Sequence, residues 1–412
     1  MTIDRVVVVG AGLAGLRTIE ELRSRGYPGE ITLIGAEDRP PYDRPPLSKK
    51  VMTGELDDTS LRPDFAALSV DFRPGERATS LDPEGVLRTT RQPREAAAEY
   101  RFDRLVLATG ATPVTLPGDG RQRVLRTMDD ALELRARLEP GRKLVVAGAG
   151  WIGAELATAA ASRGCEVTVL DLAATPLAAA VGPEVGSKTA AWYAAAGVRL
   201  LLNQGVDSVQ PGGLALAGGG WLEADEVVTA VGVRPAVTWL EGSGLHLEAG
   251  IATDAGLRAL EAAVASAEGP RASIPGIFAV GDCSSFPSRR YGRRLRFEHW
   301  DVALHAPEVA AANLLGADET YDPVPYFWSE QFGRMLQYVG YHGDADHLLW
   351  RGDPTSASWT ACWLTGNRLV AALTIDRPRD LLQARKLIAA RTPLDLTKLP
   401  NPDTPLKTTP LT

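Results

Sequence analysis

Cysteine and histidine are scarce in this chain of 412 residues. The three cysteines lie far apart, at positions 165, 283 and 362, and none forms a Cys-x-x-Cys pair. This spacing excludes a disulfide scaffold, a zinc ribbon and a redox-active dithiol built from neighbouring cysteines. The five histidines include no pair with the spacing of metal ligands, so we expect no metal site. The chemistry must therefore come mostly from a bound group.

Long apolar runs and an excess of positive charge are also missing. No segment approaches the ~20 apolar residues of a membrane span. A strand pattern that begins at Ile3 leaves no room for a signal peptide. With 44 basic and 51 acidic residues the net charge is −7, which disfavours nucleic acid or an anionic membrane as a partner. We expect a cytoplasmic protein of about three domains.

The first forty residues follow the pattern strand, glycine-rich turn, helix, strand. The turn, residues 10–15, has the sequence Gly-Ala-Gly-Leu-Ala-Gly and directly follows an apolar strand. Gly10 would allow the tight turn, Gly12 the close approach of a diphosphate, and Gly15 the packing of helix on strand. The diphosphate would lie on the helix N-terminus, and Glu37, after the second strand, would bind a ribose.

The same unit starts again 138 residues later, at Gly148. Gly150 and Gly153 complete the second glycine turn, and the strand after the next helix ends at Asp171. One such motif is weak evidence, because glycine-rich turns also serve packing, but two complete copies predict two dinucleotide sites. Asp171 would bind the ribose hydroxyls of NADH and repel the 2′-phosphate of NADPH, and no arginine follows in 172–175 to bind that phosphate.

Two further strands flank the second unit. The strand 104–107 closes on Ala108-Thr109-Gly110, and the strand 277–280 closes on Gly281-Asp282. This arrangement resembles the flavoprotein reductases with two dinucleotide sites, in which the first site holds FAD and an inserted second site holds NAD(P)H. In that family the aspartate of the Gly-Asp pair reaches the ribityl chain and diphosphate of FAD, which assigns Asp282 by resemblance.

The resemblance implies an α/β fold with two Rossmann-like dinucleotide-binding domains, as in glutathione reductase, and a small α+β C-terminal domain. The FAD domain would comprise 1–113 and 248–322, the NAD domain 114–247 and the C-terminal domain 323–412. The tail from Pro393, rich in proline and threonine, is expected to be irregular or partly mobile.

The absence of cysteine from the stretch expected beside the flavin favours some types of reductase over others. Disulfide reductases of this fold carry a cysteine pair beside the flavin, and NADH peroxidases a single cysteine, whereas the stretch 41–49 here (Pro-Tyr-Asp-Arg-Pro-Pro-Leu-Ser-Lys) has none. We interpret Cys165 as buried and inert and Cys283 as a packing residue. The stretch 41–49 resembles the segment under the flavin ring in oxygenase-coupled ferredoxin reductases, which include the putidaredoxin reductases and the reductase components of aromatic dioxygenases. Further blocks agree in order, at 125–131, 298–303 and 324–329.

This resemblance implies the site residues and the reaction. The implied catalytic residues are Lys49, Glu155 and Glu298. The implied FAD site comprises Gly10, Gly12, Leu13, Ala14, Gly15, Glu37, Arg44, Pro45, Lys49, Ala78, Ala108, Thr109, Gly110, Arg126, Asp282, Glu298, His299 and Trp300. The implied NADH site comprises Gly148, Gly150, Trp151, Ile152, Gly153, Glu155, Asp171 and Gly232. NADH would reduce FAD, which would pass electrons singly to a 2Fe–2S ferredoxin that supplies a monooxygenase or dioxygenase.

An arginine-rich segment offers a docking surface for that ferredoxin. It contains Arg289, Arg290, Arg293, Arg294 and Arg296. Ferredoxins are commonly acidic, and opposite charges speed encounter; a solvated loop that contacts no partner is the alternative. Two other functions stay open, an electron donor to rubredoxin or nitrite reductase and an NADH-sensing flavoprotein of the apoptosis-inducing-factor type.

Overall fold

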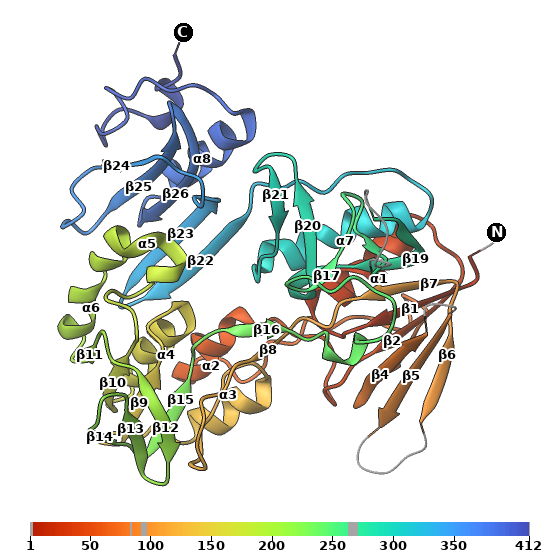
Figure 1. The fold of residues 1–412 in the computed structure, drawn as a ribbon, viewed down its shortest axis with the longest axis horizontal. Coiled ribbons are helices and arrows are strands. Elements are labelled where there is room, and N and C mark those ends of the chain that lie inside the picture. The colour runs from red at the N-terminus through yellow and green to blue at the C-terminus, as the bar shows by residue number, and fades with distance from the viewer. Residues whose placement is uncertain (1–2, 83–84, 92–96, 263–270, 412) are drawn as a thin grey trace. The chain divides into compact units, whose positions relative to one another are not determined.

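The computed structural model describes residues 3–82, 85–91, 97–262 and 271–411, and the chain divides into two compact units (Figure 1). Unit 1 is formed by 1–43, 59–112 and 234–323, and unit 2 by 44–58, 113–233 and 324–412. The short strands β8 (Ala111–Pro113) and β16 (Val233–Pro235) lie where the chain passes between units. Within the described ranges, no helix combines the length and the apolar character needed to cross a membrane.

Unit 1 is built on a six-stranded sheet of order β18-β19-β7-β1-β2-β3, in which only β18 is antiparallel (Figure 1). Its strands are β1 (Arg5–Val9), β2 (Glu30–Ile34), β3 (Val70–Arg73), β7 (Arg104–Leu107), β18 (Arg258–Leu260) and β19 (Ser273–Ala279). In β1 the four valines are all buried, as expected for a strand covered on both faces of a parallel sheet.

Two helices of unit 1 pack against each other beside this sheet, α1 (Leu13–Ser24) and α7 (Trp300–Leu314). Helix α1 buries Leu16, Ile19 and Leu22, the three-to-four-residue spacing of a single apolar face. Two small sheets complete the unit. They are β4 (Glu76–Asp82), β5 (Val86–Arg91) and β6 (Ala98–Arg101), and β17 (Ile251–Ala252), β20 (Ser284–Ser288) and β21 (Arg293–Leu295), with short 3-10 turns at η2 (Thr238–Leu240) and η3 (Gly281–Cys283).

Unit 2 repeats the parallel pattern in a four-stranded sheet of order β11-β10-β9-β15. Its strands are β9 (Lys143–Ala147), β10 (Glu166–Leu170), β11 (Arg199–Leu201) and β15 (Glu226–Thr229). A small antiparallel sheet adds β12 (Val206–Gln210), β13 (Gly213–Leu216) and β14 (Trp221–Glu223). The helices are α2 (Lys50–Thr53), α3 (Met128–Arg135), α4 (Trp151–Ser162), α5 (Ala178–Ser187) and α6 (Ala190–Ala195), with the 3-10 turn η1 (Pro45–Ser48).

The C-terminal part of unit 2 is a five-stranded antiparallel sheet of order β22-β23-β26-β25-β24. The elements are β22 (Tyr326–Gln331), β23 (Arg334–Gly340), β24 (His347–Arg351), β25 (Trp359–Thr365), β26 (Arg368–Ile375), α8 (Pro378–Ala390) and η4 (Leu406–Thr408). Residues of β25 alternate between two cores: Cys362 and Leu364 pack towards α8, and Ala361 and Trp363 pack towards α5 and α6. This antiparallel sheet with its helix confirms the expected α+β domain, and the two parallel sheets confirm the predicted pair of Rossmann-like folds. The three-domain boundaries remain a prediction.

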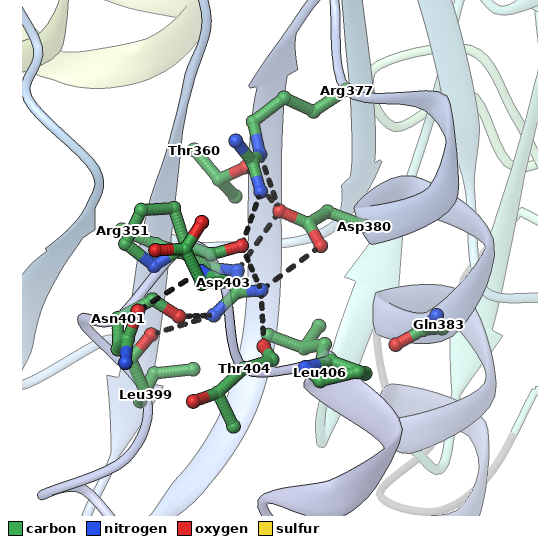
Figure 2. Close-up of polar contacts among 12 residues, drawn as sticks. Arg351, Thr360, Arg377, Asp380, Gln383, Leu399, Asn401, Asp403, Thr404 and Leu406 are labelled. Atoms are coloured by element: carbon green, nitrogen blue, oxygen red, sulfur yellow. Dashed lines mark hydrogen bonds and ion pairs between the residues drawn. The ribbon is translucent and has the colours of Figure 1, made fainter.

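The tail after Pro393 is irregular but firmly packed. Leu394, Leu399 and Leu406 are buried in the core beside α8. The guanidinium of Arg351, 1% exposed, forms a two-bond contact with Asp380 on α8, at 2.9 and 3.3 Å. Figure 2 shows that the same guanidinium reaches the tail, where it donates to the carbonyls of Leu399, Asn401, Pro402 and Thr404. A buried arginine thus ties the tail to the sheet.

Candidate functional site

The first glycine turn of the chain is shaped by close backbone contacts in unit 1. Gly10 has φ +114°, and a Cβ placed there would lie 2.1 Å from the carbonyl oxygen of Ala108. A Cβ at Gly15 would lie 1.9 Å from the carbonyl oxygen of Gly10. Both positions therefore require glycine for the protein's own folding, through the tight turn and the approach of α1.

The second glycine turn, in unit 2, has the same geometry. Gly148 has φ +112°, and a Cβ there would lie 2.3 Å from the carbonyl oxygen of Ala230. A Cβ at Gly153 would lie 1.9 Å from the carbonyl oxygen of Gly148. The sequence repeat is thus a structural repeat, with each turn opening the helix that follows the first strand of a parallel sheet.

The middle glycine of each turn is different, because nothing in the chain itself requires it. Gly12 and Gly150 have φ −91° and −77°, which any residue can adopt, and a Cβ at either would meet no described atom within 4 Å. Helices α1 and α4 begin at these glycines without a side-chain cap. Each turn thus presents backbone N–H groups to an open space, which fits the diphosphate of a dinucleotide.

This difference predicts opposite outcomes for the same substitution. Gly150→Ala is expected to leave the Tm of the apoprotein unchanged. It should raise the Kd for NADH about thirtyfold, because the added methyl would be forced against the bound diphosphate at a cost of about 2 kcal/mol. Gly153→Ala is expected to lower the Tm, because its Cβ would collide with a carbonyl. Thermal unfolding and titration with NADH would measure both; an equal fall in Tm for the two variants would contradict the assignment of Gly150.

Other predicted residues gather around the first glycine turn. Ala108 and Thr109 follow β7, and the amide nitrogen of Thr109 would lie 3.1 Å from a Cβ at Gly10. A Cβ at Gly281 would lie 3.2 Å from the Cβ of Ala14, so the turn that carries Asp282 lies against the first turn of α1. Segments far apart in the sequence are therefore brought to one edge of the parallel sheet of unit 1.

Two residues without a role predicted from the sequence hold predicted site residues in place. Tyr42 Oη donates to Glu37 Oε2 at 2.6 Å, which orients the carboxylate expected to bind a ribose. Asp43 Oδ1 accepts a hydrogen bond from the indole Nε1 of Trp300 at 2.8 Å. Tyr42 and Asp43 belong to the stretch 41–49, so the signal was present in the sequence, but only the fold supplies their partners.

The remaining predicted residues of unit 1 have different environments. Burial lowers the pKa of His299 to about 4, with the charge of Asp282 opposing the shift, so the ring is neutral at pH 7. Glu298 is exposed and accepts a hydrogen bond from Arg296 at 2.6 Å. Ala78 is buried in β4 next to a β-bulge.

The second site lies at the carboxyl ends of the sheet of unit 2. Asp171 Oδ2 accepts the N–H of Ala149 within the glycine turn, at 2.7 Å, and Oδ1 accepts the N–H of Ala173 at 2.8 Å. The carboxylate is thus fixed beside the turn. Three large apolar side chains are exposed at this edge: Ile152 at 43%, Leu172 at 77% and Val231 at 44%. Exposed apolar side chains around an open glycine turn fit the rings of a bound nucleotide.

A buried ion pair lies next to the second glycine turn. Lys49 Nζ is 2.8 Å from Glu155 Oε2, and the side chains are 13% and 1% exposed. Glu155 also accepts hydrogen bonds from Ser48 and Ser329, for which the sequence had suggested no role. Two of the three implied catalytic residues are therefore in direct contact, although 106 positions separate them.

The stretch 41–49 is divided between the two units. Arg44, Pro45 and Lys49 belong to unit 2, where Arg44 donates to the carbonyl of Arg126 at 2.5 Å. The carbonyls of Val51 and Thr53 accept from Arg135 and Arg163, which hold α2 on the second nucleotide-binding fold. The assignment of Arg44, Pro45, Lys49 and Arg126 to FAD remains a prediction.

None of the three cysteines is activated for thiol chemistry. Cys165 is half-buried rather than buried, and Cys283 and Cys362 are buried. Burial raises the pKa of all three thiols, that of Cys362 to about 12. The thiolate, which is the reactive form, is therefore disfavoured at neutral pH.

Two family models of known proteins match successive parts of the chain. The family model described as pyridine nucleotide-disulphide oxidoreductase matches residues 4–306, and the reductase C-terminal model matches 326–409. The ferredoxin–NAD(+) reductase component of the anthranilate 1,2-dioxygenase system of Burkholderia cepacia is 37% identical over 428 residues, 99% of this chain and 100% of that protein. The crystal structure of Fdr9 is 46% identical, with a TM-score of 0.90 over 98% of this chain and 99% of that one. The putidaredoxin reductase in its covalent complex with putidaredoxin is 30% identical, with a TM-score of 0.89 over 98% and 97%.

Proposed function

We propose, because this chain belongs to the pyridine nucleotide-disulphide oxidoreductase family, that it passes electrons from NADH through FAD to a 2Fe–2S ferredoxin that supplies a monooxygenase or dioxygenase. The observation that carries this proposal is the pair of open glycine turns, Gly12 in unit 1 and Gly150 in unit 2, in a chain whose cysteines are not activated. A protein that binds two dinucleotides and has no activated thiol is suited to direct hydride transfer from one dinucleotide to the other. We also propose the cytoplasm as its location, where NADH is available.

The chain's residues would bind and orient the two cofactors. When bound, FAD supplies a ring that accepts a hydride from NADH and releases electrons one at a time. The glycine turns would hold the two diphosphates, and Glu37 and Asp171 the adenosine riboses. Lys49 would place a positive charge near the ring, with its position fixed by Glu155. His299 would remain neutral, so it adds no second charge at pH 7.

An anaerobic titration with NADH tests the first half of this proposal. One equivalent of NADH should bleach the flavin absorbance of the FAD-loaded protein, because a hydride carries both electrons that FAD accepts. NADPH should act much more slowly. A flavin that stays oxidised in excess NADH would contradict the assignment of the second site.

The docking of ferredoxin is expected to depend on two of the five arginines in the segment 289–296. Arg289 and Arg293 are exposed. Arg294 instead donates to the carbonyls of Thr253 and Ser285, at 2.8 and 2.6 Å, and so belongs to the fold of unit 1. We therefore propose that Arg289 and Arg293 contact the acidic partner.

Reversing these two charges gives a direct prediction. Arg289→Glu with Arg293→Glu is expected to raise the apparent KM for ferredoxin about tenfold at low salt, since opposed patches control encounter, and to leave reduction of a small dye by NADH unchanged. The difference should shrink at high ionic strength. Arg101→Glu, an exposed arginine of β6, serves as the matched control. A KM for ferredoxin that is the same in the double variant as in the Arg101→Glu control would reject this surface.

A further inference from the structure

Three donors, the buried Ser48 and Ser329 and the partly buried Lys49, converge on the carboxylate of Glu155. Ser48 Oγ and Lys49 Nζ donate to Oε2, at 2.5 and 2.8 Å. Ser329 Oγ donates to Oε1 at 2.5 Å. Ser48 and Lys49 lie at the start of unit 2, whereas Ser329 lies on β22, in the C-terminal part of the same unit (Figure 1). The C-terminal sheet therefore contributes directly to the contacts of an implied catalytic residue.

Ser329 is itself held in place by a second buried side chain. Gln331 lies two residues further along β22, on the same face of the strand, and its Nε2 donates to Ser329 Oγ at 2.9 Å. Both side chains are buried, with Ser329 at 0% and Gln331 at 1% exposed. A serine hydroxyl carries a single proton. Because its oxygen accepts from Gln331, that proton is directed to Glu155.

These hydrogen bonds stabilise an ion pair that is largely removed from water. Lys49 supplies one positive charge, but burying both ions is unfavourable unless the other oxygen positions are also hydrogen-bonded. Ser329 binds Oε1, whereas Ser48 and Lys49 both bind Oε2. Hydrogen bonds to a charged group are strong and directional. With donors on both oxygens, the carboxylate plane is fixed, and the Lys49 ammonium with it.

We propose that Ser329 is a positioning residue that fixes the Glu155–Lys49 pair, so that the C-terminal part of the chain takes part in hydride transfer from NADH. The inference rests on the proposed function and on the implied place of Glu155 in the NADH site. Ser329, whose side chain is 0% exposed, would act through its hydrogen bond to Glu155. Its loss should therefore affect the reaction rate more than the affinity for NADH.

A double-mutant cycle in the FAD-loaded protein tests this role. Ser329→Ala is expected to lower the limiting rate of flavin reduction in rapid mixing with NADH about tenfold, the effect of losing one hydrogen bond to a charged group. The Kd for NADH should change by less than about twofold. In a Glu155→Gln background, Ser329→Ala should have almost no further effect, because the group through which it acts is already altered. Ser329→Thr, which keeps the hydroxyl, should restore most of the rate.

The same cycle has a readout that requires no cofactor. In urea unfolding of the apoprotein, the losses of stability from Ser329→Ala and Glu155→Gln should sum to more than the loss in the double variant, because both remove one interaction. Thr374→Val is the matched control. It removes a buried hydroxyl of β26, a strand of the same sheet that β23 separates from β22, and this hydroxyl donates to the carbonyl of Gln337. It should reduce stability without slowing flavin reduction.

The possible outcomes separate this inference from the function on which it rests. If NADH does not reduce the flavin of the unaltered protein, the proposed function fails. If it does, but Ser329→Ala is as fast as Thr374→Val or is equally slow in both backgrounds, the positioning role alone is overturned. If Ser329→Ala does not fold, Gln331→Met removes the donor behind the hydroxyl. That variant should slow reduction about threefold, since the interaction is one bond removed, and an unchanged rate would overturn the role.

Discussion

Replacing Asp171 by alanine and Leu172 by arginine is expected to change the preferred donor from NADH to NADPH. The ratio of kcat/KM values should shift by about a hundredfold or more, since a lost bond to a charged group and a gained arginine–phosphate contact contribute about 1.5–3 kcal/mol each. Asp171 is fixed by two backbone N–H groups beside the glycine turn, and in the proposed site its charge would repel a 2′-phosphate. Leu172 is 77% exposed, so an arginine there can reach that phosphate without repacking.

The single variants and one control separate charge from local folding. Leu172→Arg alone should improve NADPH only slightly, because the Asp171 carboxylate still repels the phosphate. Asp225→Ala removes a carboxylate that likewise accepts a backbone N–H, that of Lys143 at 2.8 Å. It should leave the donor ratio unchanged. Steady-state rates with both nucleotides would decide, and a double variant that still prefers NADH would contradict the placement of the second site.

The second large effect concerns the buried arginine of the C-terminal sheet. Arg351→Met is expected to lower the free energy of unfolding of unit 2 by about 3–5 kcal/mol, because Asp380 would be left as a buried charge with a weaker partner set. The Tm should fall by about 10 °C. A second consequence follows for the tail: four carbonyls lose their bond from Arg351 (Figure 2), although Pro402 keeps one from Arg377 and Asn401 one from the N–H of Thr404, so limited proteolysis should cut the tail faster. The exposed Arg379→Met on α8 is the matched control.

The ion pair and the tail contacts can be separated by pH and by a double variant. Burial alone would raise the pKa of Asp380, but hydrogen bonds from Arg351 and Arg377 outweigh it and hold the pKa below its usual value. This contribution is present at neutral pH and is lost as pH falls below about 4 through the lower folded-state pKa. Arg351→Met should therefore lose less stability in acid than the unaltered protein. Adding Asp380→Leu should recover only part of the loss, because the tail carbonyls remain without their bonds from Arg351.

Local features of the sequence predicted most of the fold. The valines of β1 and the glycine turns that follow β1 and β9 depend on neighbouring residues. Within the first turn, Gly10 is required by its φ of +114° and Gly15 by its contact with the carbonyl of Gly10. The second copy of the motif, which starts at Gly148, supported the same prediction for a second sheet. These elements were predictable because their pattern and their physical cause lie within the same forty residues.

Contacts between distant segments were not predictable. Ser329 and Glu155 are 174 positions apart, and neither residue type distinguishes this pair from many others. The five arginines of 289–296 look equivalent in the sequence, yet the β20–β21 hairpin turns Arg294 towards the carbonyls of Thr253 and Ser285. Likewise, only the packing of α2 on α3 and α4 places Lys49 in unit 2. Such contacts depend on how distant segments of the chain pack, and the residues next to each partner in the sequence do not indicate this.

The most direct measurement of the central claim is reduction of cytochrome c by NADH, with and without an acidic 2Fe–2S ferredoxin. We predict a slow basal rate with the FAD-loaded protein, strong stimulation that saturates with ferredoxin, and loss of that stimulation at high salt. If several ferredoxins give no stimulation, while NADH converts the flavin into a persistent complex and the protein dimerises, the chain is an NADH sensor and not a ferredoxin reductase.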